Sequence, residues 1–346
     1  MNHDQQANRG VNALSDGDAL AGSFLSAEFL TPEIRWPLVV SPLEAKPLDE
    51  FATAARRCAE VYLPVQGALL FRGLPIASSS EFETFVNFFT RSLLSYEFGS
   101  TPRSQVHRQV YTSTEYPPHQ HIPLHNEQAY TTEWPMKIWF YCGQAAEGGG
   151  GFTPIADSRE VFARIPSRVR QRFIDKQVMY VRNYGNGLDV PWQKVFNSTD
   201  RLVVEGFCRK AGIAYEWKAD GELRTRQVAQ AVAVHPRIGE TVWFNQAHLF
   251  HVSNLDPSVR EVLLSVVSEE DLPRNALYGD GTPIEIEALE EIREVYRDVA
   301  VQFAWKAGDV LMLDNMLVAH GRTPFKGRRQ ILVAMAESSQ GTAGCP

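Results

Sequence analysis

Two short segments, far apart in the sequence, constrain the fold of this chain more than any other feature. The first is His125-Asn126-Glu127, and the second runs from His320 to Arg329. Two imidazoles and one carboxylate can occupy one face of an octahedral metal ion and leave three positions open, a pattern typical of non-heme Fe(II) sites. Residues two apart on a strand project from the same side, so His125 and Glu127 can converge on one ion. A fold that uses this set must bring both segments together.

Each half of this pattern is weak when taken alone. A His-x-Glu pair occurs by chance in many chains, and a lone histidine in an apolar stretch such as 310–320 is more often a satisfied core residue. Arg329 changes the balance, because it enters the apolar segment 331–334. A buried arginine needs an anionic partner, and a carboxylate that accepts from both arms of the guanidinium fits it well. We therefore predict a metal site beside a site for a carboxylate-bearing co-substrate.

The composition is that of an ordinary globular protein and argues against several partners. The chain has 346 residues, 44% of them hydrophobic and 22% charged, which is enough for one large domain or two ordinary ones. A net charge of −7, with no run of Lys or Arg, makes nucleic acid and an anionic membrane unexpected partners. No apolar stretch approaches the roughly 18 residues that a membrane-spanning helix needs.

The N-terminal segment and the cysteines predict one cytoplasmic domain behind a disordered tail. Residues 1–23 are polar and lack the apolar core of a secretory signal, and a single domain is expected over residues 24–340. The cysteines are scattered without CxxC spacing, which favours neither a disulfide framework nor a zinc knuckle. Free thiols suit a reducing compartment. The oligomeric state stays open, and a homo-oligomer is compatible with the sequence.

Hydrophobic periodicity predicts short strands around the metal segments, with helices at the start and in an insertion. Helices are expected over 48–62, 81–89, 158–173 (with Ser158 as N-cap), a stretch before 211, 259–267 and 286–300. Strands are expected over 68–71, 138–141, 178–181, 213–217, 228–234, 241–244, 249–252, 301–304, 310–313 and 330–336. Irregular strand spacing favours a mainly β protein with α, a sandwich or jelly roll with flanking helices and a helical insertion at about 185–300, over a doubly wound parallel sheet.

Four segments together carry a family resemblance. They are His125-Asn-Glu127, Gly150-Gly-Phe-Thr153, Asp314-Asn315 followed by His320, and Arg329. In this order they resemble the taurine dioxygenase/TfdA-type family of Fe(II)- and 2-oxoglutarate-dependent oxygenases. The resemblance implies a distorted jelly roll (a double-stranded β-helix), with Fe(II) on His125, Glu127 and His320. It also implies 2-oxoglutarate on Arg329 and Thr153, O2 as second co-substrate, and oxidative decarboxylation to succinate and CO2.

Other segments are similar to one branch of that family, the syringomycin-type hydroxylases of nonribosomal peptide pathways. They include 111–116, 153–159, 245–248 and 318–322. This implies hydroxylation at Cβ of an acidic or polar aminoacyl group, free or tethered to a peptidyl carrier protein. Related halogenases have a small residue where Glu127 stands, so halogenation is disfavoured. Many relatives that take free anionic substrates have a second arginine where Val333 stands, so either a thioester masks the substrate carboxylate or another arginine binds it.

Several polar side chains could contact the substrate. The candidates are His121, Arg103, Arg182, Asn245, Gln246 and Arg322. For each arginine, a structural salt bridge is at least as good an interpretation. His248 and His251 are more consistent with structural or supporting roles, the aromatic run 139–141 with the core, and His235 carries no signal.

Three alternatives remain open. The same chemistry could desaturate or cyclise a free amino acid instead of hydroxylating it. The chain could also be a non-catalytic jelly-roll protein that binds a metal or ligand, although such a protein does not need Arg329 and Thr153. A zinc hydrolase would use a tetrahedral three-ligand site with a general base, and it leaves Arg329 unexplained.

Overall fold

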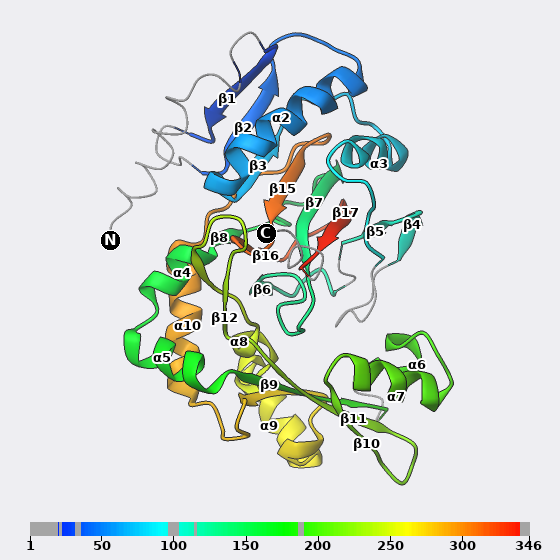
Figure 1. Ribbon diagram of the computed structural model, residues 1–346, viewed down its shortest axis with the longest axis vertical. Coiled ribbons are helices and arrows are strands. Elements are labelled where there is room, and N and C mark those ends of the chain that lie inside the picture. The colour runs from blue at the N-terminus through cyan, green and yellow to red at the C-terminus, as the bar shows by residue number, and fades with distance from the viewer. Residues whose placement is uncertain are drawn as a thin grey trace.

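The largest sheet of the protein gathers strands from both ends of the chain (Figure 1). The computed structural model describes residues 20, 23–31, 36–95, 104–113, 116–185 and 190–339. Arg103 and, apart from residues 20 and 23, the expected N-terminal tail lie outside these residues. In pairing order the strands are β1 (Leu25–Phe29), β2 (Leu38–Pro42), β3 (Ala68–Phe71), β15 (Val310–Asp314), β7 (Pro135–Gln144), β17 (Gln330–Ser338), β5 (Val110–Thr112) and β4 (Gln105–His107). Neighbours are antiparallel except β2 and β3.

A second, smaller sheet faces the first and carries the metal segments. Its strands pair in the order β6 (Ile122–His125), β16 (Val318–Arg322) and β8 (Ile155–Asp157), all antiparallel. Side chains from the inner faces of both sheets share one hydrophobic core, which includes Ile138, Phe140, Leu311, Ile155 and Val318. Two facing sheets with helices outside confirm the predicted mainly β jelly roll with flanking helices.

Two helices cover the outer face of the large sheet. They are α2 (Leu48–Gln66) and α3 (Ser79–Asn87). Alternation along β7 turns Trp139 and Tyr141 toward these helices, while Phe140 faces the inner core. Gly67 ends α2 with a φ of 71°, and a Cβ there would lie 2.8 Å from Cγ2 of Val318. Glycine therefore lets the end of the helix pass close to the strand that leads to His320.

In the sequence, an insertion between β8 and β15 contains strands as well as helices (Figure 1). Its elements are α4 (Ser158–Arg164), α5 (Ser167–Lys176), β9 (Val178–Tyr184), α6 (Trp192–Val195), α7 (Arg201–Lys210), β10 (Ala214–Trp217), β11 (Leu223–Ala229), β12 (Val232–Val234), β13 (Thr241–Trp243), α8 (Ala247–Phe250), the 3-10 helix η2 (Val252–Asn254), α9 (Pro257–Val266), the 3-10 helix η3 (Glu269–Asp271), β14 (Arg274–Tyr278) and α10 (Ile286–Val299). An antiparallel sheet orders as β10-β11-β9-β14, and β12 pairs with β13. The segment expected to be a helical insertion is thus mixed.

Three local predictions were wrong. The helix expected over 158–173 is two helices, because Ile165 precedes Pro166 and adopts an extended ψ of 128°. Its N-cap is Asp157, whose carboxylate accepts from the backbone N of Arg159 at 2.8 Å, rather than Ser158. The strands expected over 249–252 and 301–304 are α8 with η2, and a single bridge between Ile155 and Val301. Short apolar runs of this kind do not distinguish helix from strand.

Candidate active site

The small sheet brings His125 and His320 face to face. The two residues are direct antiparallel partners on β6 and β16. Their ring centroids are 4.7 Å apart, and Nε2 of His320 lies 3.8 Å from Oε2 of Glu127. One ligand atom from each of the three side chains lies within 4.8 Å of the other two. This spacing and the two-imidazole, one-carboxylate donor set suit a first-row metal ion such as Fe(II), with further coordination positions for other molecules.

Local hydrogen bonding selects the nitrogen that His125 presents. Its Nδ1 donates to the carbonyl oxygen of Pro123 at 2.8 Å. This contact keeps the proton on Nδ1 and leaves Nε2 as the ligand atom, the arrangement that commonly orients metal-binding histidines. Phe140 packs against the ring of His320, with centroids 4.9 Å apart. One histidine is thus fixed by a carbonyl and the other by an aromatic wall.

Two buried asparagines connect the metal segments to each other. The side chain of Asn315 accepts from the backbone N of Glu127 at 2.7 Å and donates to its carbonyl at 2.9 Å. In return, Nδ2 of Asn126 donates to the carbonyl of Asn315 at 2.7 Å. Sequence reasoning used Asn126 and Asn315 only as parts of motifs and missed this role. The Asp-Asn dipeptide before His320 was the signal that could have suggested it.

A buried imidazole-carboxylate pair supports the turn before β16. Nε2 of His235 lies 3.0 Å from Oδ2 of Asp314, and backbone N–H groups of Arg237 and Ile238 donate to its Nδ1. The other carboxylate oxygen of Asp314 accepts from the backbone N of Met316. His235, which carried no signal in the sequence, therefore helps to hold the turn that leads to His320.

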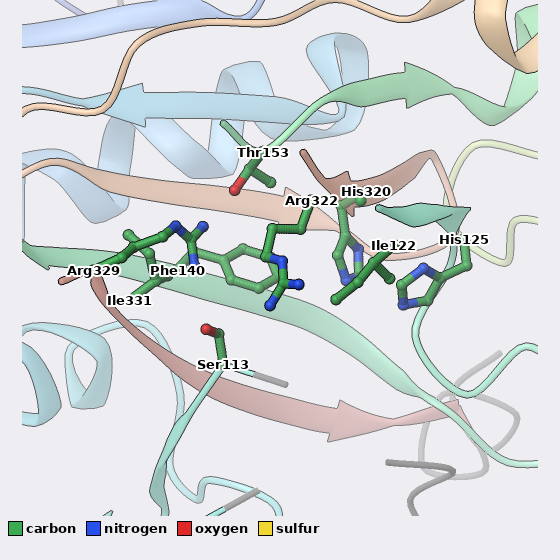
Figure 2. Close-up of a pocket in the computed structure, with 10 residues that line it drawn as sticks. Ser113, Ile122, His125, Phe140, Thr153, His320, Arg322, Arg329 and Ile331 are labelled. Atoms are coloured by element: carbon green, nitrogen blue, oxygen red, sulfur yellow. The ribbon is translucent and has the colours of Figure 1, made fainter. Parts of the chain in front are cut away.

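A pocket opens beside the two histidines (Figure 2). It is lined by Ser113, Ile122, His125, Phe140, Thr153, His320, Gly321, Arg322, Arg329 and Ile331. Figure 2 shows Arg329 at one end and the imidazoles at the other, with Phe140 and Arg322 between them. The guanidinium groups of Arg322 and Arg329 make the interior of this pocket strongly cationic. The pocket therefore favours an anion that reaches from the imidazoles toward Arg329.

Arg329 is a partly buried cation, and within the described part of the chain no ion pair joins it to an acid. Its Nε donates to the carbonyl of Gly151 at 2.9 Å, and its guanidinium lies 5.4 Å from the ring centre of Phe325. Burial, with a smaller contribution from Arg322, lowers the pKa of Arg329 to about 10, so it stays charged at neutral pH. Thr153 accepts from Nε1 of Trp305 at 3.1 Å, which leaves its hydroxyl proton to donate to a bound group. The guanidinium of Arg329 and the hydroxyl of Thr153 together suit the binding of a carboxylate.

Arg322 lines the same pocket but is largely committed to the main chain. It donates to the carbonyl oxygens of Tyr116, Pro117 and Gln120 at 2.7 to 3.0 Å. Burial lowers the pKa of Arg322, and among the described residues its Nε has no hydrogen-bond partner. These bonds hold the loop before His121, an exposed residue that is not among those lining the pocket.

The other substrate candidates lie outside the pocket lining. Asn245 donates to the carbonyl of Ala231, and Gln246 donates to that of Asn126, both at 2.7 Å. Arg182 lies on β9 in the insertion. His248 donates through Nε2 to the carbonyl of Leu124 at 2.9 Å, and burial lowers its pKa to about 3. Gln246 and His248 thus brace the strand that carries His125, which agrees with a supporting role for His248.

Comparison with known proteins shows which class this fold and site belong to. Residues 47–335 match the model of the taurine catabolism dioxygenase TauD, TfdA family. The chain belongs to this family, and it is an Fe(II)- and 2-oxoglutarate-dependent dioxygenase that uses O2 as co-substrate. The prediction from the four motifs is thereby confirmed at the level of family, enzyme class and cofactors. The family match favours the dioxygenase over the two other classes considered from the sequence, a zinc hydrolase and a non-catalytic binding protein.

Individual relatives place the chain more closely. It is 42% identical over 275 residues, 80% of its own length and 83% of the relative's, to the dapdiamide synthesis protein DdaC of Enterobacter agglomerans. It is 31% identical over 282 residues, 78% of its length and 82% of the relative's, to a clavaminate synthase-like protein of Arabidopsis thaliana. The crystal structure of the PvcB protein from Pseudomonas aeruginosa covers 90% of each chain with a TM-score of 0.51 at 16% identity, a likeness of fold alone.

Among the helices of the described residues, none is both long and apolar enough to cross a membrane. Cys58, Cys142 and Cys208 are buried free thiols, so no disulfide joins them.

Proposed function

We propose that this dioxygenase hydroxylates Cβ of an acidic or polar aminoacyl group in secondary-metabolite biosynthesis, acting in the cytoplasm on a small-molecule amino acid that is free or carried on a peptidyl carrier protein. The observation that carries the proposal is the convergence of His125, Glu127 and His320 beside the partly buried Arg329. The similarity to a protein named for dapdiamide synthesis supports a biosynthetic role. The motifs that resemble the syringomycin-type hydroxylases support an aminoacyl substrate.

The residues of this chain would divide the work among binding, orientation and exclusion of water. His125, Glu127 and His320 would hold Fe(II), and Arg329 with Thr153 would bind the distal carboxylate of 2-oxoglutarate. Once Fe(II), 2-oxoglutarate and O2 are bound, oxidative decarboxylation of the keto acid to succinate and CO2 supplies the power to insert oxygen into a substrate C–H bond. The protein's own contribution is to position the two substrates and to keep bulk water from the apolar wall at Phe140 and Ile331.

Two residues bear on the type of reaction and on how the substrate carboxylate is bound. Glu127 is only 5% exposed and places a carboxylate where a halogenase would need space for a halide, which favours hydroxylation. Val333 is fully buried in β17 and offers no charge to a substrate carboxylate. Either the carboxylate is esterified as a thioester, or a cation elsewhere in the chain binds it. Desaturation or cyclisation of a free amino acid by the same chemistry is the second candidate, which product analysis separates from the first.

A substrate screen with a ligand variant tests the proposal. Each of the twenty amino acids, free and loaded on a carrier protein as a thioester, is incubated with Fe(II), 2-oxoglutarate and O2, and succinate and products are measured by mass spectrometry. At least one acidic or polar amino acid should gain one oxygen atom, and His125→Ala should abolish both products. His107→Gln, at the edge strand β4, should behave as wild type.

The screen also has clear negative outcomes. Succinate release that survives in His125→Ala would refute the metal site. If the wild-type enzyme converts none of the amino acids in either form, the aminoacyl substrate is wrong while the dioxygenase class stands. A product that has lost two hydrogens without gaining oxygen would favour desaturation or cyclisation.

A further inference from the structure

Arg182 is a buried cation whose surroundings do not account for it. It lies on β9 between Tyr180 and Tyr184, and alternation along the strand places these three side chains on one face of the four-stranded sheet. Only 7% of Arg182 is exposed. Within the described residues its Nε and Nη2 have no hydrogen-bond partner, and its guanidinium lies 4.8 Å from the ring centre of Tyr184. A guanidinium normally satisfies its N–H donors when it is removed from water.

The cross-strand neighbours of Arg182 do not supply it with an anion. In the register of the sheet, Thr225 of β11 lies opposite Arg182 on one side and Arg274 of β14 on the other. Neither position offers a carboxylate to Arg182. The ring contact with Tyr184 contributes only about 1–2 kcal/mol. A bound anion would give the unpartnered Nε and Nη2 of Arg182 an acceptor.

This face of the sheet leads back to the candidate metal site through an aromatic cluster. Tyr130 lies in the turn just after Glu127, and its ring centroid lies 6.2 Å from that of Tyr180 and 5.1 Å from that of Phe250. The guanidinium of Arg274 in turn lies 5.9 Å from the centre of the Phe250 ring. Arg182 is two residues beyond Tyr180, a step of about 7 Å along an extended strand.

A second hydrophobic cluster closes the far side of Arg182. Tyr184 packs there with Trp192, Phe196 and Leu223 from α6, the segment after it, and β11. Apolar walls on both sides lower the local dielectric and strengthen any ion pair that forms between them. The guanidinium is thus set between two aromatic clusters, one of which begins at the metal-bearing turn.

We propose that Arg182 binds a carboxylate of the substrate, so that the substrate extends from the metal site past Tyr130 and Tyr180 to the sheet of the insertion. The inference rests on the proposed function, since it takes the metal site as the place of reaction. It assigns the substrate class as one with an unesterified carboxylate remote from the carbon that is oxidised. A planar guanidinium with two unused donors suits bidentate recognition of such a group.

A binding experiment tests the inference without knowledge of the substrate. Inorganic sulfate serves as the anion probe and is titrated without O2 into the Fe(II)–2-oxoglutarate complex, in which the site at Arg329 is already filled. Isothermal titration calorimetry should show saturable binding to the wild-type protein. Arg182→Gln should bind sulfate at least about tenfold more weakly, because a charge-assisted contact is lost. Arg182→Lys, which keeps the charge but not the fork, should fall between the two.

A matched control and a second readout make the result decisive. Arg226→Gln removes an arginine from β11 on the opposite face, where Arg226 pairs with Glu216 and Glu270, and it should bind sulfate as wild type does. Absence of saturable sulfate binding in the wild type, or equal affinity in Arg182→Gln and Arg182→Lys, would overturn the inference. Failure of the proposed function appears separately, as a wild-type protein that forms no Fe(II)–2-oxoglutarate absorbance band and releases no succinate.

Discussion

Asn315 forms hydrogen bonds to the main chain of Glu127 with both the oxygen and the nitrogen of its side-chain amide. The Oδ1 atom accepts from the N–H of Glu127, and the Nδ2 group donates to its carbonyl oxygen and also to that of Pro135. Asn315 is fully buried, so none of these groups can turn to water instead. The position of the Glu127 carboxylate relative to His320 therefore depends on one amide from the turn before β16.

We expect Asn315→Asp to weaken Fe(II) binding by about 10- to 100-fold, as the loss of an outer hydrogen-bonding partner does at other metal sites. The aspartate loses the Nδ2 donor and places a negative charge against two carbonyls, which should also lower the free energy of unfolding by about 1–3 kcal/mol. Anaerobic Fe(II) titration and urea denaturation measure the two effects. Asn254→Asp, at a partly buried position in η2, is the control, and equal metal affinity in both variants would contradict the prediction.

Substitution of Gly151 should separate backbone strain from damage to the co-substrate site. Gly151 has a φ of +67°, and a Cβ there would lie 2.8 Å from Cδ of Arg329, whereas Gly149 has a φ of +83° with no atom that close. Both alanine variants should lose about 1–3 kcal/mol of stability through strain. Only Gly151→Ala should raise the KM for 2-oxoglutarate, by about tenfold or more, because it displaces the guanidinium. The same KM in both variants would show that Arg329 does not bind the co-substrate.

Replacement of Arg329 should cost binding rather than folding. In the described residues Arg329 is a partly buried cation with no acidic partner, and burial lowers its pKa to about 10. Arg329→Met removes this charge at similar volume, so without 2-oxoglutarate its free energy of unfolding should stay within about 1 kcal/mol of wild type. At a 2-oxoglutarate concentration of 100 times Kd, the wild type should gain about 2.7 kcal/mol and the variant should not. Denaturation of the Fe(II)-loaded proteins with and without 2-oxoglutarate decides this, and an equal gain in both would exclude Arg329 from the site.

The stability of the insertion should fall in acid because His251 is buried in its neutral form. Burial, with contributions from Arg293 and Arg260, lowers the pKa of His251 to about 4, against about 6.5 in the unfolded chain. Between these values only the unfolded chain takes up the proton, so the free energy of unfolding falls as the pH drops from 6.5 to 4. The loss from this one group is on the order of 1–2 kcal/mol at pH 5.

His251→Asn should make the decline with pH shallower by that amount. Asparagine can still accept from the backbone N of Ser253, as Nδ1 of His251 does at 3.1 Å, so the N-cap of η2 is retained. Urea denaturation from pH 7 to 4.5 gives the slopes, with the exposed His119→Asn as control. Parallel slopes in wild type and His251→Asn would show that this imidazole does not resist protonation.

Those parts of the fold and site that depend on local spacing could be predicted from the sequence. His125 and Glu127 share one side of the chain at any extended backbone, and Arg329 stands at the mouth of an apolar strand. The facing sheets follow from short apolar strands with irregular spacing. By contrast, the helix break at Pro166 and the helical structure at 249–252 depend on competition between local preferences, which periodicity alone does not resolve.

Long-range polar partners could not be predicted, because pairing across strands leaves no local signature. His235 meets Asp314 only after β12 and β13 are placed against β15. Gln246 was a candidate substrate contact in the sequence, but its side-chain amide donates a hydrogen bond to the carbonyl oxygen of Asn126. Arg182 was one of three candidate substrate arginines in the sequence, and its burial and the register of β9 became visible only in the structure.

The direct pairing of His125 with His320 ties iron affinity to strand alignment. Side chains on a strand alternate between faces, so a slip of β16 by one residue would turn His320 away from His125 and put Ala319 or Gly321 in its place. A misaligned chain would then lose its affinity for iron completely and not gradually. Iron binding would therefore distinguish correctly folded molecules from misfolded ones, because only molecules with β6 and β16 in the correct register would bind the metal.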